Sequence, residues 1–228
     1  MMLPSLRSRR ASAAPAAALF LALGLALCPG VARAQKVSAD KKGNVWYTDR
    51  AGKRTRLTGD GKDSDPVLSP DKRRIAYVHQ VAGKDISTGS GDAEPSELRL
   101  MEIDGKNQET LVRSVDAKEP EDILAAFSSP TFSPDGRTIY FCSAAWATSG
   151  SIHAYDFGKK AQRYVMPGNG PQVVPGGEYK GHLLVEQHRY FLGGGSYDWY
   201  WLFTPEGKEI GPVGETTDSF RDMYFEQK

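Results

Sequence analysis

The side chains in this sequence with the clearest potential for chemistry are four histidines, because imidazoles bind metal ions. They are His79, His153, His182 and His188. No two of them have the His-x-His or His-x-x-x-His spacing that would place two imidazoles on one face of a strand or helix. His79 and His188 fall near the ends of expected strands, where an imidazole is typically a surface or edge residue. The sequence therefore predicts no metal site and no cofactor.

Three aspartates, Asp60, Asp63 and Asp65, cluster ahead of a Ser-Pro-Asp segment. Carboxylates gathered in this way could hold a cation such as calcium. A solvated turn, in which an aspartate accepts hydrogen bonds from its own backbone, explains the same residues. Of these two interpretations we favour the turn.

Two serines that follow glycine, Ser151 and Ser196, stand where a catalytic nucleophile could be sought. Neither has the Gly-x-Ser-x-Gly pattern of a nucleophile elbow, and no alternation of strands and helices surrounds them. The sequence therefore predicts no catalytic residue and a protein that is not an enzyme.

A repeated motif dominates the middle of the chain. Residues 65–78 (DPVLSPDKRRIAYV) and 129–142 (SPTFSPDGRTIYFC) share the pattern Pro-x-apolar-Ser-Pro-Asp, followed by a basic tip and an isoleucine. Residues 171–185 form a third copy that keeps both prolines and the tip glycine but has lost the serine and the aspartate. Proline fixes the backbone for a turn and aspartate supplies its side-chain hydrogen bond, so each copy predicts a tight hairpin.

A second hairpin follows each of these copies, and one more precedes them. Their segments are residues 45–57, 98–112, 152–159 and 200–208. Each segment reads as a strand, a turn with Gly-Lys, and the start of a more polar strand. The chain therefore has four such outer hairpins but only three of the Ser-Pro-Asp type.

This arrangement resembles the WD40-like repeat of TolB-type propellers, which also occurs in the propeller domains of prolyl-oligopeptidase-type enzymes. The resemblance covers about residues 44–213. It implies an all-β fold, a small β-propeller of four-stranded blades, with about four blades and a first blade that lacks its inner hairpin. TolB has an α/β domain ahead of six blades, so we expect a TolB-like protein that is not TolB itself.

Propellers usually have four to eight blades. We expect the tail, residues 219–225, to supply an inner strand to the unfinished first blade, with Val37 beside it, and so to close the ring. The alternative is an open ring that exposes strand edges and assembles with a partner or with further copies.

Long connections gather on one face of such a propeller. They are residues 83–97, 113–129, 144–150 and 189–198, and we expect residues 119–127 to form a short helix and residues 84–96 to be mobile. Binding residues concentrate on loops that a rigid scaffold holds.

Within these connections we predict partner-binding anchors at Trp146, Tyr190 and Tyr197, with Asp85 and Asp198 on the rim. Aromatic side chains in connections have less packing to satisfy than those in strands, so their exposure indicates a binding role. By contrast, a strand that carries Trp199, Tyr200 and Trp201 is expected to bury one of its two faces.

The N-terminus reads as a signal peptide, residues 1–34, followed by one propeller domain, residues 35–228. It has a basic start, an apolar stretch at residues 16–27 and an Ala32-Arg33-Ala34 cleavage pattern. The apolar stretch is shorter than the roughly 20 residues that cross a bilayer. A twin-arginine signal at Arg9 and Arg10 and a lipid anchor on Cys28 match their patterns less well. We therefore expect a periplasmic protein.

The charge balance of the mature chain argues against nucleic acid as a partner. The predicted signal carries four arginines and no acid, so the mature chain has 25 basic and 28 acidic residues and no charge excess that would suit nucleic acid. Cys142 is the single cysteine after Cys28 is removed, so no intramolecular disulfide is expected and the core alone must hold the fold.

Together these features predict an exported, non-catalytic propeller that binds a protein or peptide in the periplasm. A six-bladed relative engages a peptidoglycan-associated lipoprotein, but its contact residues have no match here, so that partner is not predicted. Two alternatives stay open. One is a polysaccharide lyase with a histidine-bound metal, as in some related propellers, and the other is a structural subunit that assembles through open strand edges.

We predict cleavage after Ala34, because the small side chains of Ala32 and Ala34 suit a signal peptidase. Mass spectrometry of protein from its native host should find an N-terminus at Gln35. An intact Met1 or a lipidated Cys28 would contradict this assignment.

Overall fold

The turns and apolar runs of the sequence produce a succession of antiparallel sheets. The computed structural model describes residues 33–226, which belong to the compact unit Ala32–Lys228. All but two residues of the predicted signal peptide lie outside the described residues.

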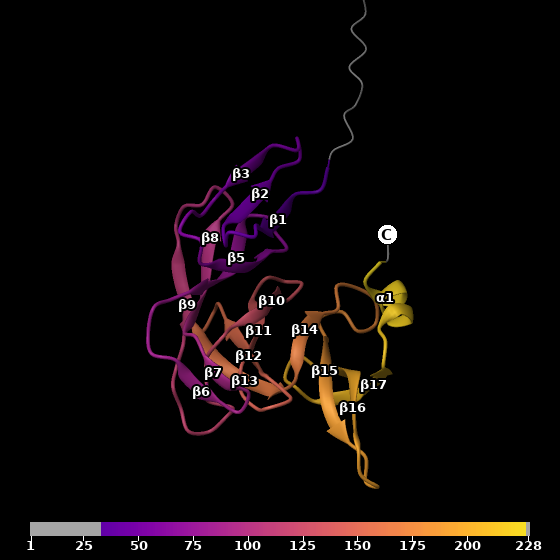
Figure 1. The fold of residues 1–228 in the computed structure, drawn as a ribbon. Helices are drawn as coiled ribbons and strands as arrows, with labels where there is room; N and C mark the ends of the chain where they lie inside the picture. The colour runs from indigo at the N-terminus through magenta and orange to yellow at the C-terminus, as the bar shows by residue number, and fades with distance from the viewer. Residues whose placement is uncertain (1–32, 227–228) are drawn as a thin grey trace, which may run out of the picture. The chain divides into compact units, whose positions relative to one another are not determined.

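Four sheets follow one another along the chain, and we call them the first to fourth blades (Figure 1). The first blade contains β1 (Lys36–Ala39), β2 (Val45–Thr48) and β3 (Arg54–Arg56). The second contains β4 (Asp63–Leu68), β5 (Arg74–Gln80), β8 (Ser96–Glu102) and β9 (Glu109–Arg113). The third contains β10 (Ser128–Phe132), β11 (Thr138–Ser143), β12 (Ser151–Asp156) and β13 (Ala161–Pro167). The fourth contains β14 (Asn169–Val173), β15 (Leu183–Tyr190), β16 (Ser196–Phe203) and β17 (Glu209–Gly214).

Two smaller elements complete the described chain. A hairpin of β6 (Ile86–Thr88) and β7 (Gly91–Ala93) lies between β5 and β8, and helix α1 (Asp218–Tyr224) follows β17. This helix is too short to cross a membrane, and no other helix occurs in the described part of the chain. The predicted all-β class and four-stranded blades are confirmed.

The Ser-Pro-Asp turns have the predicted chemistry. In the β4–β5 turn, the Ser69 hydroxyl donates to the Asp71 carboxylate at 2.5 Å and accepts the Arg74 backbone N–H at 2.9 Å. In the β10–β11 turn, Ser133 makes the same two bonds to Asp135 and Thr138, at 2.7 and 3.0 Å. Each serine therefore closes its hairpin by bonding both to the turn and to the returning strand.

The blades pack face to face, and alternate residues of one strand contact different neighbours. On β5, Ile75 and Tyr77 pack with Val45 and Tyr47 of the first blade. Ala76 and Val78, the residues between and beyond them, point the other way into the cluster shared with the third blade. Because successive strand residues face opposite sides, a blade that is buried on both faces needs an apolar residue at nearly every position.

The first blade lacks an innermost strand in the described residues. Its β2–β3 hairpin has the Gly-Lys turn of the outer hairpins, at Gly52 and Lys53, so β1, which pairs with β2, occupies the second position. The predicted deficit of one inner hairpin is confirmed, and Val37 lies in β1.

The expected closure by a C-terminal strand is wrong, because residues 218–224 form α1 instead. Phe220 and Tyr224 are four residues apart, which places both side chains on one face of a helix. This face packs on Val174, Leu184 and Leu202 of the fourth blade. Among residues 33–226, no strand pairing and no buried hydrophobic cluster joins the first blade to the fourth.

The helix expected in the connections is also wrong, whereas the expected mobility of residues 84–96 stays a prediction. Residues 119–127 form no helix, because Val115 and Leu124 pair in a short β-bridge and Ile123 and Ala125 point away from Leu124 into another cluster. Residues 84–96 contain the β6–β7 hairpin, whose Ile86 is buried in the same cluster as Ile123 and Ala125. Ile123, Leu124 and Ala125 are buried in alternating directions, which requires extended backbone.

We predict that Phe220→Ala lowers the free energy of unfolding by about 3 kcal/mol, because it leaves a cavity over an otherwise uncovered apolar sheet face. Chemical denaturation checks this value. Asp222→Ala, at an exposed position of the same helix, should change stability little. Equal stability of the Phe220 variant and the wild-type chain would show that α1 does not cover the fourth blade.

Candidate functional site

Long connections meet at one end of the blades, as the sequence predicts. They span residues 81–95, 114–127 and 144–150, and we call this end the long-loop face. The expected long connection 189–198 is wrong in length, because β15 and β16 extend into it and leave only the short turn 191–195 at this end. The opposite ends of the strands carry the short Ser-Pro-Asp and Gly-Lys turns, together with the longer β14–β15 connection at residues 174–182. A rigid stack of sheets thus presents long loops on one side, and binding residues usually lie on loops that such a scaffold holds.

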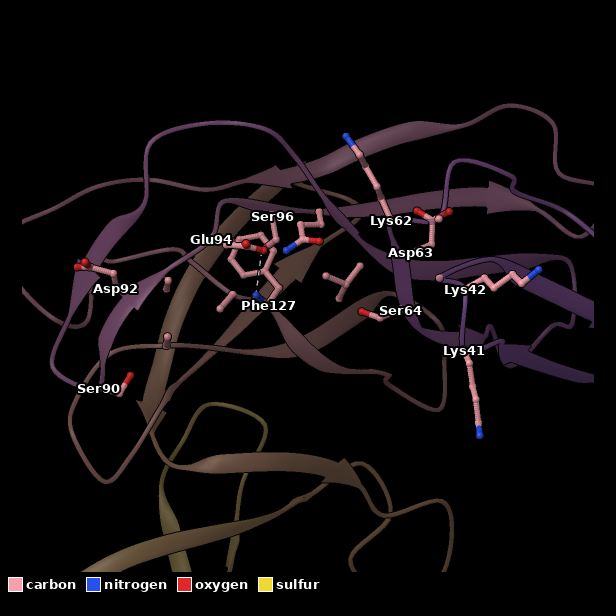
Figure 2. Close-up of a pocket in the computed structure, with 17 residues that line it drawn as sticks. Lys41, Lys42, Lys62, Asp63, Ser64, Ser90, Asp92, Glu94, Ser96 and Phe127 are labelled. Atoms are coloured by element: carbon pink, nitrogen blue, oxygen red, sulfur yellow. Dashed lines mark hydrogen bonds between the residues drawn. The ribbon is translucent and has the colours of Figure 1, made fainter.

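A cavity of about 770 Å³ opens on the long-loop face over the first three blades (Figure 2). Its lining includes charged residues of both signs, namely Lys41, Lys42, Lys62, Asp63, Asp92 and Glu94. The three lysine side chains point away from one another, so their ammonium groups do not converge on one anion. A hydrogen bond joins two residues of the cavity wall, because the Phe127 backbone N–H donates to the Ser96 hydroxyl at 2.9 Å.

Trp146 lies in the β11–β12 connection and is half-buried. The β6–β7 hairpin packs on this connection, because the Gly89 backbone N–H donates to the Ala145 carbonyl at 2.6 Å. A Cβ atom at Gly89 would lie 2.8 Å from the Trp146 Cα, so only glycine permits this approach. Trp146 lines a smaller hollow of about 320 Å³ beside the cavity.

Asp85 is exposed at the start of the β6–β7 segment and lines a separate small hollow with Lys62 and Glu94. No hydrogen bond or ion pair of its side chain occurs among the described residues. Its position fits the rim role predicted from the sequence.

Tyr190, Tyr197 and Asp198 come together on the β15–β16 hairpin, which extends from the fourth blade (Figure 1). Tyr190 is 71% exposed and its ring lies 5.0 Å from that of His188, edge to face. His188 in turn shares a 2.8 Å hydrogen bond, through Nδ1, with the Asp198 carboxylate across the hairpin. Tyr190 is therefore not a lid on the core, whereas Tyr197 is half-buried.

Three further apolar residues belong to this hairpin, and the sequence analysis does not place them among the binding residues. Phe191 is 56% exposed, Leu192 is fully exposed and Trp199 is also exposed. Phe191 stacks on Tyr197 with ring centres 4.6 Å apart, and Tyr197 contacts Trp199 at 5.2 Å. The sequence contains a signal for Phe191 and Leu192. They end a run of three apolar residues directly before three glycines, and side chains at such a tight turn typically face solvent.

We call Tyr190, Phe191 and Leu192 the apolar tip. The turn beyond it needs glycine, since Gly194 and Gly195 have φ of +92° and +85°. At its base, Arg189 lies over the Trp201 ring at 3.4 Å and pairs with Glu209 at 2.6 Å. The tip is thus held by a well-connected hairpin. No ring contact or hydrogen bond among residues 33–226 joins it to Trp146 or Asp85.

The four histidines do not converge. His79 lies in the second blade, His153 in the third, and His182 and His188 belong to the fourth. Burial lowers the pKa of His153 to about 4, so it stays neutral, and its ring bonds to Ser151 and Gln162. A core role accounts for this residue, and the histidine-rich site of a metal-dependent lyase is not formed by the described side chains.

One group of possible metal ligands does form within residues 33–226, and it consists of Asp60, Asp63 and His79. Asp65, which the sequence groups with the first two, instead accepts the Ser129 backbone N–H at 3.3 Å.

No protein-family model and no curated protein matches the sequence. Solved structures do match. A structure assigned to TolB of Agrobacterium tumefaciens has a TM-score of 0.56 at 14% identity, covering 80% of this chain and 62% of that one. Dipeptidyl peptidase 4 of Porphyromonas gingivalis has a TM-score of 0.51 at 9% identity, with 81% and 32% coverage. The propeller domain of the Trilobed protease from Pyrococcus furiosus, described as an open velcro topology, has a TM-score of 0.50 at 12% identity, with 80% and 53% coverage.

This chain spans less than two thirds of each of these structures. At such low identity the likeness concerns the fold and not the activity. The chain has a TolB-like β-propeller fold, with four described blades of which the first lacks its innermost strand.

Proposed function

We propose that this chain is an exported, non-catalytic propeller that binds a protein in the periplasm through its long-loop face. The observation that carries the proposal is the apolar tip. Leu192 is fully exposed, and Tyr190 and Phe191 are each more than half exposed. All three lie at the end of a hairpin that the fold holds in place. Soluble proteins seldom keep apolar side chains together in water unless another surface covers them.

The tip suits a partner with an apolar groove. Interface energy concentrates in a few aromatic or large apolar anchors surrounded by polar contacts. Phe191 and Leu192 would enter the groove, while Tyr190 and Tyr197 flank it with amphipathic rings. Asp198, already oriented by His188, would meet a basic rim and set the register of docking.

The cavity side of the same face provides a second contact in this proposal. Trp146 is held on a connection that the β6–β7 hairpin supports, and exposed Asp85 stands at the edge of the neighbouring hollow. An extended or multi-lobed partner would reach both the tip and the cavity. The N-terminal signal pattern supports export to the compartment where such a partner would be met.

We predict that Phe191→Ala and Leu192→Ala each weaken partner binding by about 2 kcal/mol, roughly 30-fold, without lowering the melting temperature. A partner is first captured from an envelope extract by cross-linking, then purified, and its affinity for each variant is measured by calorimetry. The exposed tip makes few internal contacts, so its truncation should leave the fold intact.

Ile210→Ala is the matched control, because Ile210 is an exposed apolar residue of the same blade but lies on β17, away from the hairpin turn. It should bind as the wild-type chain does. If the tip variants bind normally while Trp146→Ala binds weakly, the anchor lies at the cavity and not at the tip. If none of them weakens binding, the long-loop face is not the docking surface.

A further inference from the structure

Asp60, Asp63 and His79 come from two segments that the fold brings together between the first two blades. Asp63, the first residue of β4, is the cross-strand partner of His79 on β5. His79 Nδ1 lies 2.7 Å from an Asp63 carboxylate oxygen and 3.8 Å from one of Asp60, which belongs to the β3–β4 connection. We infer that these three side chains bind a divalent transition-metal ion.

The charges of the group call for a cation. Asp63 is only 4% exposed and His79 only 7%, so both side chains have lost most of their hydration. The two carboxylates bring two negative charges to the group, and burying a carboxylate without a compensating charge is costly. Within residues 33–226 neither aspartate forms an ion pair with lysine or arginine. A divalent ion would balance the two carboxylates.

The spacing of the three ligand atoms suits such an ion. Nitrogen and oxygen ligands about 2.0–2.2 Å from a zinc ion stand about 3.3–3.6 Å apart in a tetrahedral arrangement. The distances of 2.7 and 3.8 Å lie on either side of this range, and all three atoms lie within 4.8 Å of one another. Small side-chain rotations would let each of them reach one ion, which would take the place of the hydrogen bond between His79 Nδ1 and the Asp63 carboxylate.

The donor set selects the class of metal. Calcium takes six to eight oxygen ligands, and magnesium likewise prefers oxygen, whereas one imidazole nitrogen with two carboxylates suits zinc or manganese. Water would complete the coordination. An ion can also reach the site, because Asp63 lines the 770 Å³ cavity (Figure 2) and the Asp60 side chain is 52% exposed.

The bound ion would join the β3–β4 connection to the second blade. The first blade has no innermost strand of its own in the described residues, so a bridge from Asp60 to β4 and β5 reinforces its attachment. The role is structural, and it is independent of whether a protein partner docks at the apolar tip.

The test is calorimetric titration of the purified chain, without a polyhistidine tag and pretreated with a chelator, with Zn²⁺ and with Mn²⁺. We expect one ion per chain and a higher melting temperature in its presence. Asp60→Asn should weaken binding at least tenfold, because it removes one ligand charge at an exposed position and leaves the buried pair intact.

His188→Gln is the matched control. His188 and Asp198 form a cross-strand pair with the same Nδ1–carboxylate geometry, at 2.8 Å, but no residue within 33–226 adds a third ligand to this pair. This variant should bind the ion as the wild-type chain does. The inference is overturned if the wild-type chain shows no saturable binding of either ion, if Asp60→Asn binds as tightly as the wild type, or if binding is lost on His188→Gln.

Discussion

Face-to-face packing of sheets is the constraint on which this structure depends. A central strand such as β11 is buried on both sides, with Ile139 and Phe141 packed toward the second blade and Tyr140 and Cys142 toward the fourth. A blade of this kind cannot be stable alone, because half of its apolar residues would face water. Each blade therefore requires a neighbour on each side, and the cores of this fold lie between sheets and not within them.

The two end blades meet this requirement in different ways. On the fourth blade, Leu184 points away from the third blade and is covered by Phe220 of α1. On the first blade, the residue that points away from the second is Trp46, whose ring lies under the Arg54 guanidinium at 4.3 Å. The indole N–H donates to Asp40 and lowers the pKa of that carboxyl to about 2. A helix at one end and a polar surface at the other take the places of further blades, as capping units do in repeat proteins.

The same stacking decides where chemistry can be placed. Residues that end a strand on the long-loop face meet their cross-strand partner and the loop of the adjacent blade. Cross-strand pairing forms two histidine–aspartate pairs, Asp63 with His79 and His188 with Asp198. Among the described residues, only the first pair gains a third possible ligand, which is Asp60 of the β3–β4 connection. The second pair instead supports the hairpin that carries Tyr190. Equivalent pairs thus serve a buried charged group in one blade and an exposed apolar surface in another.

The sequence by itself determined the elements whose chemistry is local. The Ser-Pro-Asp and Gly-Lys turns, the count of four outer and three inner hairpins, and the location of the long connections all depend on residues a few positions apart. Backbone preferences and short-range hydrogen bonds are sufficient for these. The tertiary structure decided the rest. Whether residues 218–224 formed a strand or a helix depended on the bare face of the fourth blade, which Phe220 covers. In the Asp60–Asp63–His79 group, the sequence already places the two aspartates three residues apart, but only the β4–β5 register brings His79 to them, because no sequence spacing encodes a cross-strand contact.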